Sequence, residues 1–190
     1  LAFLASVLIF AYPEIDREIR GILLGAVIIV ILGVLDDIIT LHAGLKFVVQ
    51  ILAAVLVVLH GCRIEHFVGL HLADWLSYPV SVVWIVAITN AVNFIDGLDG
   101  LAAGVSAISA GAMLVVALLV GDFMSAVMLA AIVGACVGFI PYNFNPAKIF
   151  MGDTGSTFLG FMLSTISIYG LFKMYAIISF AVPFLVLGLP

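Results

Sequence analysis

Residues 101–120 read LAAGVSAISAGAMLVVALLV, which is twenty consecutive residues without a charge. About 20 apolar residues in a helix are enough to cross the hydrocarbon core of a bilayer. Comparable apolar runs recur along the chain, which is 66% hydrophobic and 9% charged, with a mean hydropathy of +1.41. The runs are continuous rather than alternating, which excludes a transmembrane β-barrel. The sequence therefore predicts an all-α, polytopic bundle of transmembrane helices.

Eight membrane-spanning segments are predicted. They cover Leu1–Ala11, Ile19–Leu35, Leu45–His60, Pro79–Ala91, Leu101–Val120, Met124–Ile140, Thr157–Leu171 and Met174–Pro190. The chain begins with Leu rather than Met, and its last residues are still apolar. We therefore interpret residues 1–190 as a single membrane domain, truncated at both ends, with no signal peptide in the first span.

Polar residues gather in three clusters within this apolar background. They are Asp36-Asp37, Asn90–Gly100 (NAVNFIDGLDG) and Asn143–Ser156 (NFNPAKIFMGDTGS). These clusters hold five of the eleven acidic residues, although they make up a small part of the chain. A charged side chain at the centre of a membrane helix costs roughly 2.5–3.5 kcal/mol on insertion scales. Acids kept beside long apolar runs therefore point to chemistry or transport.

Counting the spans places all three clusters on one side of the membrane, because alternate connections lie on the same side. The positive-inside rule assigns the side richer in Lys and Arg to the cytoplasm. Lys46 and Lys148 lie on the cluster side, and the other side holds Arg17, Arg20, Arg63 and Lys173. This bias of four to two opposes a cytoplasmic location for the clusters. Six residues are a small sample, so the rule carries little weight here.

The first cluster ends an apolar run with two adjacent carboxylates. Neighbouring residues on a helix point about 100° apart, so Asp36 and Asp37 are expected to serve different partners. Two carboxylates repel each other and gain most from a shared cation, which is either a metal ion or Lys46. The alternative is a hydrated helix end, and the two interpretations are evenly balanced from this cluster alone.

The second cluster repeats a polar group every three residues, at Asn90, Asn93, Asp96 and Asp99. On one continuous helix the first and last of these would lie on opposite faces. Glycines at 97 and 100 can break the helix and turn the later carboxylates back toward one site. Amides with carboxylates suit a hydrated cation, a sugar or a nucleotide, and the simpler alternative is a polar turn.

The third cluster precedes an apolar helix. Thr154 or Ser156 is expected to cap that helix, whose N-terminus would attract phosphate. Asp153 beside such a site would bind phosphate only through a divalent metal, and Mg²⁺ is usually held by one or two carboxylates plus substrate phosphates. Gly152 allows close backbone approach, and Phe150 offers a stacking face. The alternative is a capped helix start with an incidental aspartate.

Together the three motifs resemble those of the polyprenyl-phosphate N-acetylhexosamine-1-phosphate transferases. The motifs are Gly-Val-Leu-Asp-Asp37, Asn90-x-x-Asn-x-x-Asp-Gly-x-Asp-Gly-Leu-x-x-Gly104 and Asn145-Pro-Ala-Lys-Ile-Phe-Met-Gly-Asp-Thr-Gly-Ser156. The last motif, with Phe158-Leu-Gly160, looks more like the GlcNAc-1-phosphate transferases than the phospho-MurNAc-pentapeptide transferases.

The resemblance implies transfer of GlcNAc-1-phosphate from UDP-GlcNAc to undecaprenyl phosphate, with release of UMP, at the cytoplasmic face of the bacterial inner membrane. This is the first membrane step of a cell-envelope glycan, such as teichoic acid or a lipopolysaccharide. It implies Mg²⁺, with Mn²⁺ as the alternative ion, and ten or eleven spans in the whole protein. An N-terminal helix and a C-terminal loop bearing His and Arg would then lie outside this chain. The expected partners are the nucleotide sugar, the lipid phosphate, the bilayer and, as an option, a second copy of the chain, without nucleic acid.

The resemblance also implies roles for individual residues. Asp153 would be the principal metal ligand, with Asp36 and Asp37 beside the metal and the lipid phosphate. Lys46 matches a basic position after the aspartate pair and completes the predicted catalytic set. The predicted substrate-binding residues, centred on the uridine, are Asn90, Asn93, Asp96, Asp99, Lys148, Phe150 and Gly152.

Three other interpretations compete with this one. A phospho-MurNAc-pentapeptide transferase would share the motifs. An ion-coupled transporter would place its acids near the membrane midplane in broken helices, whereas here they lie at the ends of spans. A CDP-alcohol phosphotransferase would need an Ala-Arg after the first Asp-Gly, and Asp96-Gly-Leu-Asp-Gly has no arginine nearby.

Overall fold

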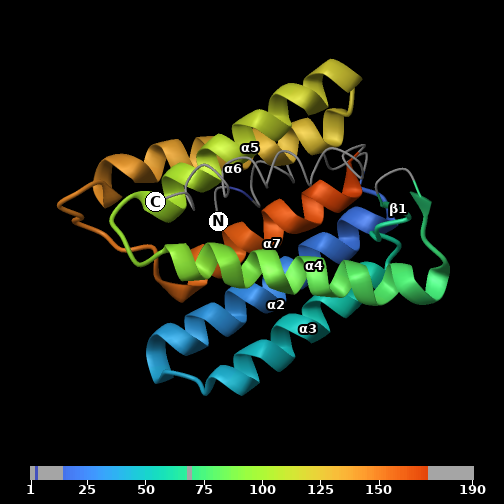
Figure 1. Cartoon of the computed structure of the whole chain (residues 1–190). Helices are drawn as coiled ribbons and strands as arrows, with labels where there is room; N and C mark the ends of the chain where they lie inside the picture. Colours follow the sequence, from blue (N-terminus) through green and yellow to red (C-terminus); the bar gives the residue numbers. More distant parts are fainter. Residues whose placement is uncertain (1–2, 4–14, 68–69, 171–190) are drawn as a thin grey trace.

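The computed structural model describes Phe3 and residues 15–67 and 70–170 (Figure 1). Within them, the helices are α2 (Arg17–Ile39), α3 (Ala43–Leu59), α4 (Asp74–Ile95), α5 (Leu101–Val120), α6 (Phe123–Asn143) and α7 (Gly152–Tyr169). The only strands in this part of the chain are β1 (His66–Phe67) and β2 (Leu70–His71), which form a short antiparallel hairpin between α3 and α4. The predicted all-α bundle is confirmed apart from this hairpin.

Among the residues that the structure describes, four helices are long and apolar enough to cross a membrane: α2, α4, α5 and α6. Helix α3 is apolar but has only 17 residues, and α7 is 18 residues long with a more polar composition. The prediction of several membrane-spanning helices is therefore confirmed, but the predicted number of eight is not shown. The predicted spans Leu1–Ala11, apart from Phe3, and Met174–Pro190 lie outside the described residues.

Several helices extend beyond their predicted ends. Helix α2 continues past Leu35 to Ile39, so Asp36 and Asp37 lie in its last turns rather than in a loop. Helix α4 contains Pro79, at which the predicted span began, and α6 contains Pro141, just before which the predicted span ended. A proline inside a helix removes one backbone hydrogen bond, and both of these prolines lie within two turns of a helix end.

Local sequence explains most helix boundaries. The Asp16 side chain accepts a 2.8 Å hydrogen bond from the N–H of Ile19 and caps α2, while Asp122 caps α6 through the N–H of Ser125 at 3.0 Å. Such caps satisfy amides that a helix leaves unpaired at its start. Helix α5 lies between Gly100 and Gly121, both with a φ of +76°. Glycine adopts this left-handed conformation without steric cost, so it separates α5 from its neighbours.

Helix α7 is the central helix of the bundle and packs against α2, α4, α5 and α6. Nearly every residue from Ser156 to Ile168 is buried. Its buried hydroxyls bond to the helix backbone itself, for example Ser164 to the carbonyl of Phe161 at 2.8 Å. Because α7 is surrounded by protein, it tolerates small polar residues that a lipid-facing helix would not.

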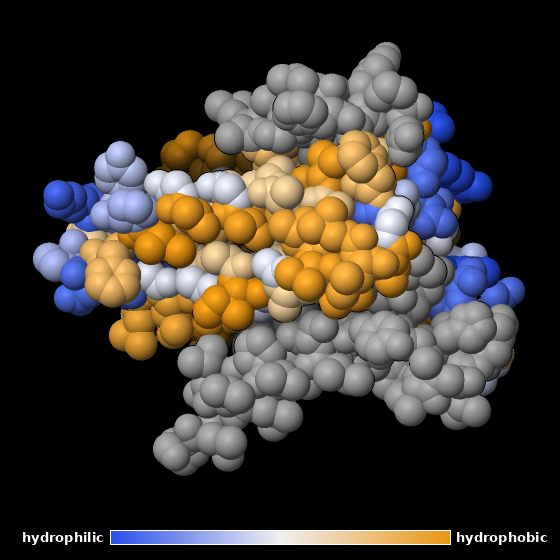
Figure 2. All heavy atoms as spheres, turned by 90° about the horizontal axis from the view of Figure 1, so that it is seen from above, coloured by the Kyte–Doolittle hydropathy of each residue, from blue (hydrophilic) through white to orange (hydrophobic). Residues whose placement is uncertain are grey.

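The hydropathy of the surface changes along the length of the helices. Figure 2 shows hydrophobic residues over the middle of one face and hydrophilic residues at both ends. At the end that holds the hairpin, Arg63 pairs with Asp74 at 3.1 Å, and Tyr169 donates to Asp16 at 3.1 Å. The other end holds the three polar clusters. An apolar middle between two polar ends is the arrangement expected of a protein that crosses a bilayer.

Close packing of α4 against α7 depends on Gly160. A Cβ added there would lie 2.7 Å from the Cα of Thr89, which is backbone and cannot move aside. We expect Gly160→Ala to lower the melting temperature in detergent, since overpacking costs about 1–3 kcal/mol. Gly111→Ala in α5 is the matched control, because nothing lies within 4 Å of its added Cβ. Equal melting temperatures for the two variants would contradict this packing argument.

Candidate functional site

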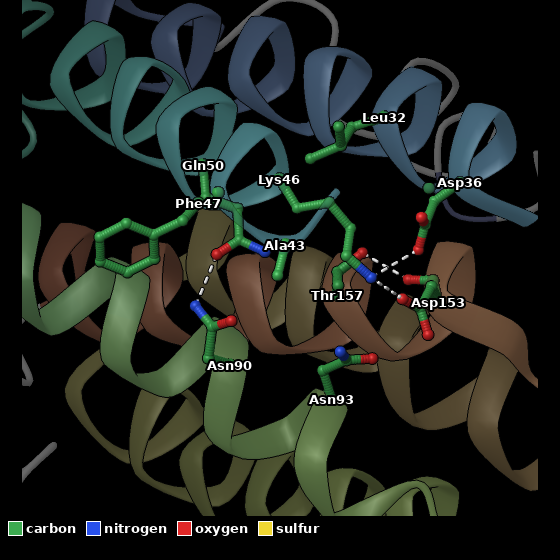
Figure 3. A pocket seen from close by; sticks show the side chains of 12 residues that line it. Leu32, Asp36, Ala43, Lys46, Phe47, Gln50, Asn90, Asn93, Asp153 and Thr157 are labelled. Atoms are coloured by element: carbon green, nitrogen blue, oxygen red, sulfur yellow. Dashed lines mark hydrogen bonds and ion pairs between the residues drawn. The ribbon is translucent and has the colours of Figure 1, made fainter. Parts of the chain in front are cut away.

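The three polar clusters meet at one end of the bundle, where α2 and α4 end and α3 and α7 begin (Figure 3). A cavity of about 520 Å³ lies between these four helices. It is lined by Leu32, Gly33, Asp36, Ala43, Gly44, Lys46, Phe47, Gln50, Asn90, Asn93, Asp153 and Thr157. The convergence predicted from counting spans is therefore present in the fold.

Lys46 connects the first cluster to the third. Its Nζ lies 2.7 Å from Asp36 Oδ2 and 2.8 Å from Asp153 Oδ2, across 107 residues of sequence in the second case. Asp36 is 8% exposed, and its Oδ1 accepts a 2.7 Å hydrogen bond from the N–H of Leu41. Two carboxylates sharing one ammonium leave a net negative charge at the mouth of the cavity. Such a group can accept a further cation or hold a phosphate through one.

Asp37 bonds instead to the start of α7. Its carboxylate accepts hydrogen bonds from the N–H of Asp153 at 3.1 Å and from the Thr154 hydroxyl at 2.6 Å. The two adjacent aspartates therefore have different partners, as their predicted angular separation requires. The prediction that Thr154 or Ser156 caps α7 is wrong. Helix α7 starts at Gly152, five residues before the predicted span, and Asp37 from α2 bonds to its first amides instead.

The amides of the second cluster line the opposite wall of the cavity. Asn93 accepts a 2.6 Å hydrogen bond from the Ser156 hydroxyl, and Asn90 donates to Gln50 Oε1 and to the carbonyl of Val86. Gln50 is only 4% exposed. We did not predict it as a site residue, although a glutamine one turn after Lys46 in an apolar helix was an available signal.

Other predicted residues lie outside the lining of the cavity. Asp99 Oδ2 accepts hydrogen bonds from the N–H of Ala147 at 3.0 Å and from Asn145 at 3.3 Å, so it joins the second cluster to the third. Lys148 and Phe150 are exposed, with Phe150 74% exposed. The helix does break after Ile95, and Gly100 adopts the left-handed conformation, as predicted.

The described residues contain no group of three His, Cys, Asp or Glu side chains arranged to hold a metal ion. What they offer is the pair Asp36 and Asp153, both directed at the ammonium of Lys46. Hard carboxylate oxygens are the ligands that Mg²⁺ prefers, and one or two are enough when substrate phosphates supply the rest. The residues therefore fit a metal ion that arrives with a phosphate substrate.

Asp96 gives the folding stability a measurable pH dependence. Burial and, to a smaller extent, the negative charge of Asp153 raise the pKa of the Asp96 carboxyl from 3.8 to about 6. The folded protein therefore binds this proton more tightly than the unfolded chain, and folding stability falls as the pH rises through that window. We expect the melting temperature of Asp96→Asn, measured without metal, to rise relative to that of the wild type as the pH increases from 4 to 7. A constant difference between the two proteins would contradict the raised pKa.

The fold and the site define a class: a helical, multi-pass membrane protein with a lysine-bridged acidic pocket at one end of its bundle. The chain belongs to glycosyl transferase family 4, and the family model matches residues 19–171. The family resemblance inferred from the three motifs is thereby confirmed.

The chain is similar to two kinds of transferase. The chain is 43% identical over 180 residues to the probable undecaprenyl-phosphate N-acetylglucosaminyl 1-phosphate transferase of Bacillus subtilis (strain 168), covering 92% of this chain and 50% of that protein. It is 39% identical over 159 residues to the phospho-N-acetylmuramoyl-pentapeptide-transferase of Desulforudis audaxviator (strain MP104C), covering 84% and 45%. The chain spans about half the length of the curated relatives it matches.

Proposed function

We propose that the protein transfers N-acetylglucosamine-1-phosphate from UDP-N-acetylglucosamine to undecaprenyl phosphate and releases UMP. The observation that supports this most directly is the pocket in which Lys46 bridges Asp36 and Asp153. The pocket lies at the polar end of an apolar bundle. A soluble nucleotide sugar and a lipid phosphate can both reach such a place. The identity to the Bacillus subtilis relative supports the choice of sugar.

The reaction exchanges one phosphoanhydride bond for another. An oxygen of the lipid phosphate attacks the sugar-linked phosphorus of the donor, and the bond from that phosphorus to the UMP oxygen breaks. UMP leaves with the bonding electrons, and the product is a lipid-linked pyrophosphate. Both reactants are anionic, so positioning and charge neutralisation are the main tasks of the site. The ammonium of Lys46 would supply part of that neutralisation.

Magnesium is the cofactor that the donor set fits best. Asp153 and Asp36 would hold it together with donor phosphates, and it would supply further positive charge against the phosphate oxygens. Mn²⁺ has similar ligand preferences and is the alternative. The amide wall formed by Asn90 and Asn93 would face the uridine or the sugar, with Asp96, Asp99, Lys148, Phe150 and Gly152 as the surrounding predicted substrate residues.

A general-base role for the aspartates contributes little by this reasoning. A phosphate monoester has a second pKa near 6, so at pH 7 roughly 90% of the lipid phosphate is already the dianion. Removing its last proton lowers the barrier very little. Asp36 would therefore hold and orient charge rather than take a proton. If Asp36→Asn regained most of its activity at pH 9, the base role would be correct instead.

Phospho-N-acetylmuramoyl-pentapeptide transfer is the second candidate, and the 39% identity to the Desulforudis audaxviator relative supports it. It uses the same bond exchange with a larger donor. An ion-coupled transporter is disfavoured, because the acids cluster at one end of the helices rather than near their middle.

The membrane arrangement completes the proposal. All six described helices would cross the bacterial inner membrane, with two further spans near the chain ends. Helix α7 could cross because it is shielded by protein on all sides. The pocket would face the cytoplasm, where nucleotide sugars are found, despite the opposing count of basic residues.

The experiment is a UMP-release assay on the full-length protein in nanodiscs. UDP-N-acetylglucosamine and UDP-MurNAc-pentapeptide are compared as donors, each with and without undecaprenyl phosphate, Mg²⁺ and EDTA. UMP release that needs the first donor, the lipid and Mg²⁺ supports the proposal. Release only with the second donor selects the second candidate, and release with neither refutes both.

A further inference from the structure

Helix α7 begins without a capping side chain of its own. Its first residue is Gly152, with a φ of +68°, and the preceding Met151 contributes no side-chain hydrogen bond. The amides of a helix's first turn have no partners within the helix and need outside acceptors. Asp153, whose carboxylate lines the pocket, lies in this first turn. Its position therefore depends on whatever fixes the start of α7.

Asp37 supplies the missing acceptor from a different helix. Its Oδ1 accepts from the N–H of Asp153 at 3.1 Å, and its Oδ2 accepts from the Thr154 N–H at 3.4 Å and the Thr154 hydroxyl at 2.6 Å. Both carboxylate oxygens thus bond to α7. A carboxylate at a helix N-terminus also interacts favourably with the helix dipole.

The backbone contact next to this cap is equally close. A Cβ added to Gly33, one turn before Asp37, would clash with the Cα of Thr154. A Cβ added to Gly152 would lie 3.1 Å from Asp37 Oδ2. The end of α2 and the start of α7 therefore fit against each other at two neighbouring points, and the hydrogen bonds of Asp37 fix their register.

We infer that Asp37 is a positioning residue: through the backbone of α7 and the hydroxyl of Thr154, it sets where the Asp153 carboxylate stands beside Lys46. In this role it neither ligates a metal nor accepts a proton, whereas Asp36 faces Lys46 directly. The sequence prediction placed both aspartates at the metal. This inference rests on the proposed function only for its kinetic readout.

Thr154 gives the test, because a positioning role requires it and a direct role of Asp37 does not. Thr154→Val removes the hydroxyl at nearly constant size, and Thr154→Ser keeps it. We expect Thr154→Val to lower kcat about 10-fold, since small displacements of a reacting group are costly. KM for the nucleotide sugar should stay within about 2-fold, and Thr154→Ser should restore kcat to within about 2-fold of the wild type.

A double-mutant cycle of Asp37→Ala with Thr154→Val completes the test. We expect the double variant to be no slower and no less heat-stable than Asp37→Ala alone, because both substitutions remove the same interaction between α2 and α7. Wild-type kcat in Thr154→Val, or fully additive losses in the cycle, would overturn the inference. The melting-temperature cycle does not use activity, so it still decides the inference if the wild type releases no UMP and the proposed function fails.

Discussion

Lys46→Met is expected to abolish transfer activity, with a loss of about 10²–10³-fold in kcat, as for the removal of other preorganised charge-stabilising groups. The ammonium bridges Asp36 Oδ2 and Asp153 Oδ2 at 2.7 and 2.8 Å. Without it, two carboxylates face each other, and the pocket repels both anionic substrates. The measurement is UMP release in nanodiscs, with the melting temperature determined in parallel.

Two further variants separate charge from folding. Adding Asp36→Asn to Lys46→Met removes the repulsion, so it should recover part of any lost heat stability but not the activity. Arg20→Met is the control, because Arg20 lies exposed at the opposite end of α2, where it donates a 3.2 Å hydrogen bond to the carbonyl of Asp16. Activity within about 10-fold of the wild type in Lys46→Met would remove Lys46 from the proposed mechanism.

The convergence of the clusters was predictable because it depends on parity alone. Two successive spans bring the chain back to the side of the membrane from which it started. This holds even when the predicted ends of the spans are wrong by a few residues. Helix α2 runs four residues beyond its predicted end, yet Asp36 still lies at the same end of the bundle as Asp153. The long uncharged run at 101–120 also gave α5 its correct bounds, since glycines flank it on both sides.

The pairing of individual groups was not predictable from one sequence. Polar residues at 36, 37 and 153 were assigned to loops, because charge in an apolar chain resembles a break in a helix. They are helical because their side chains find partners on other helices, and local sequence does not record those partners. The cap of α7 illustrates this point, since Asp37 is 117 residues away from Thr154. Gln50 was overlooked for the same reason: its partner, Asn90, lies on another helix.

Asp153→Asn is expected to have an equally large effect, a loss of at least about 10³-fold in kcat. The proposed metal would lose its principal ligand, and the pocket would lose the negative charge of the Asp153 carboxylate. The substitution is well isolated from the fold. Asp37 bonds to the backbone N–H of residue 153, and the Thr157 hydroxyl bonds to its backbone carbonyl. Asparagine keeps both groups, so the start of α7 should remain in place.

A measurement independent of turnover should show the same change. We expect Mn²⁺ binding, followed by electron paramagnetic resonance in the presence of UDP-N-acetylglucosamine, to weaken at least about 10-fold in Asp153→Asn, since one of few carboxylate ligands is lost. Asp122→Ala is the matched control, because Asp122 caps the start of α6 and lies outside the cavity lining. It should lower the melting temperature while leaving Mn²⁺ binding nearly unchanged. Equal Mn²⁺ affinity in Asp153→Asn and the wild type would mean that the metal binds elsewhere, and Asp153 would then act through its contact with Lys46 alone.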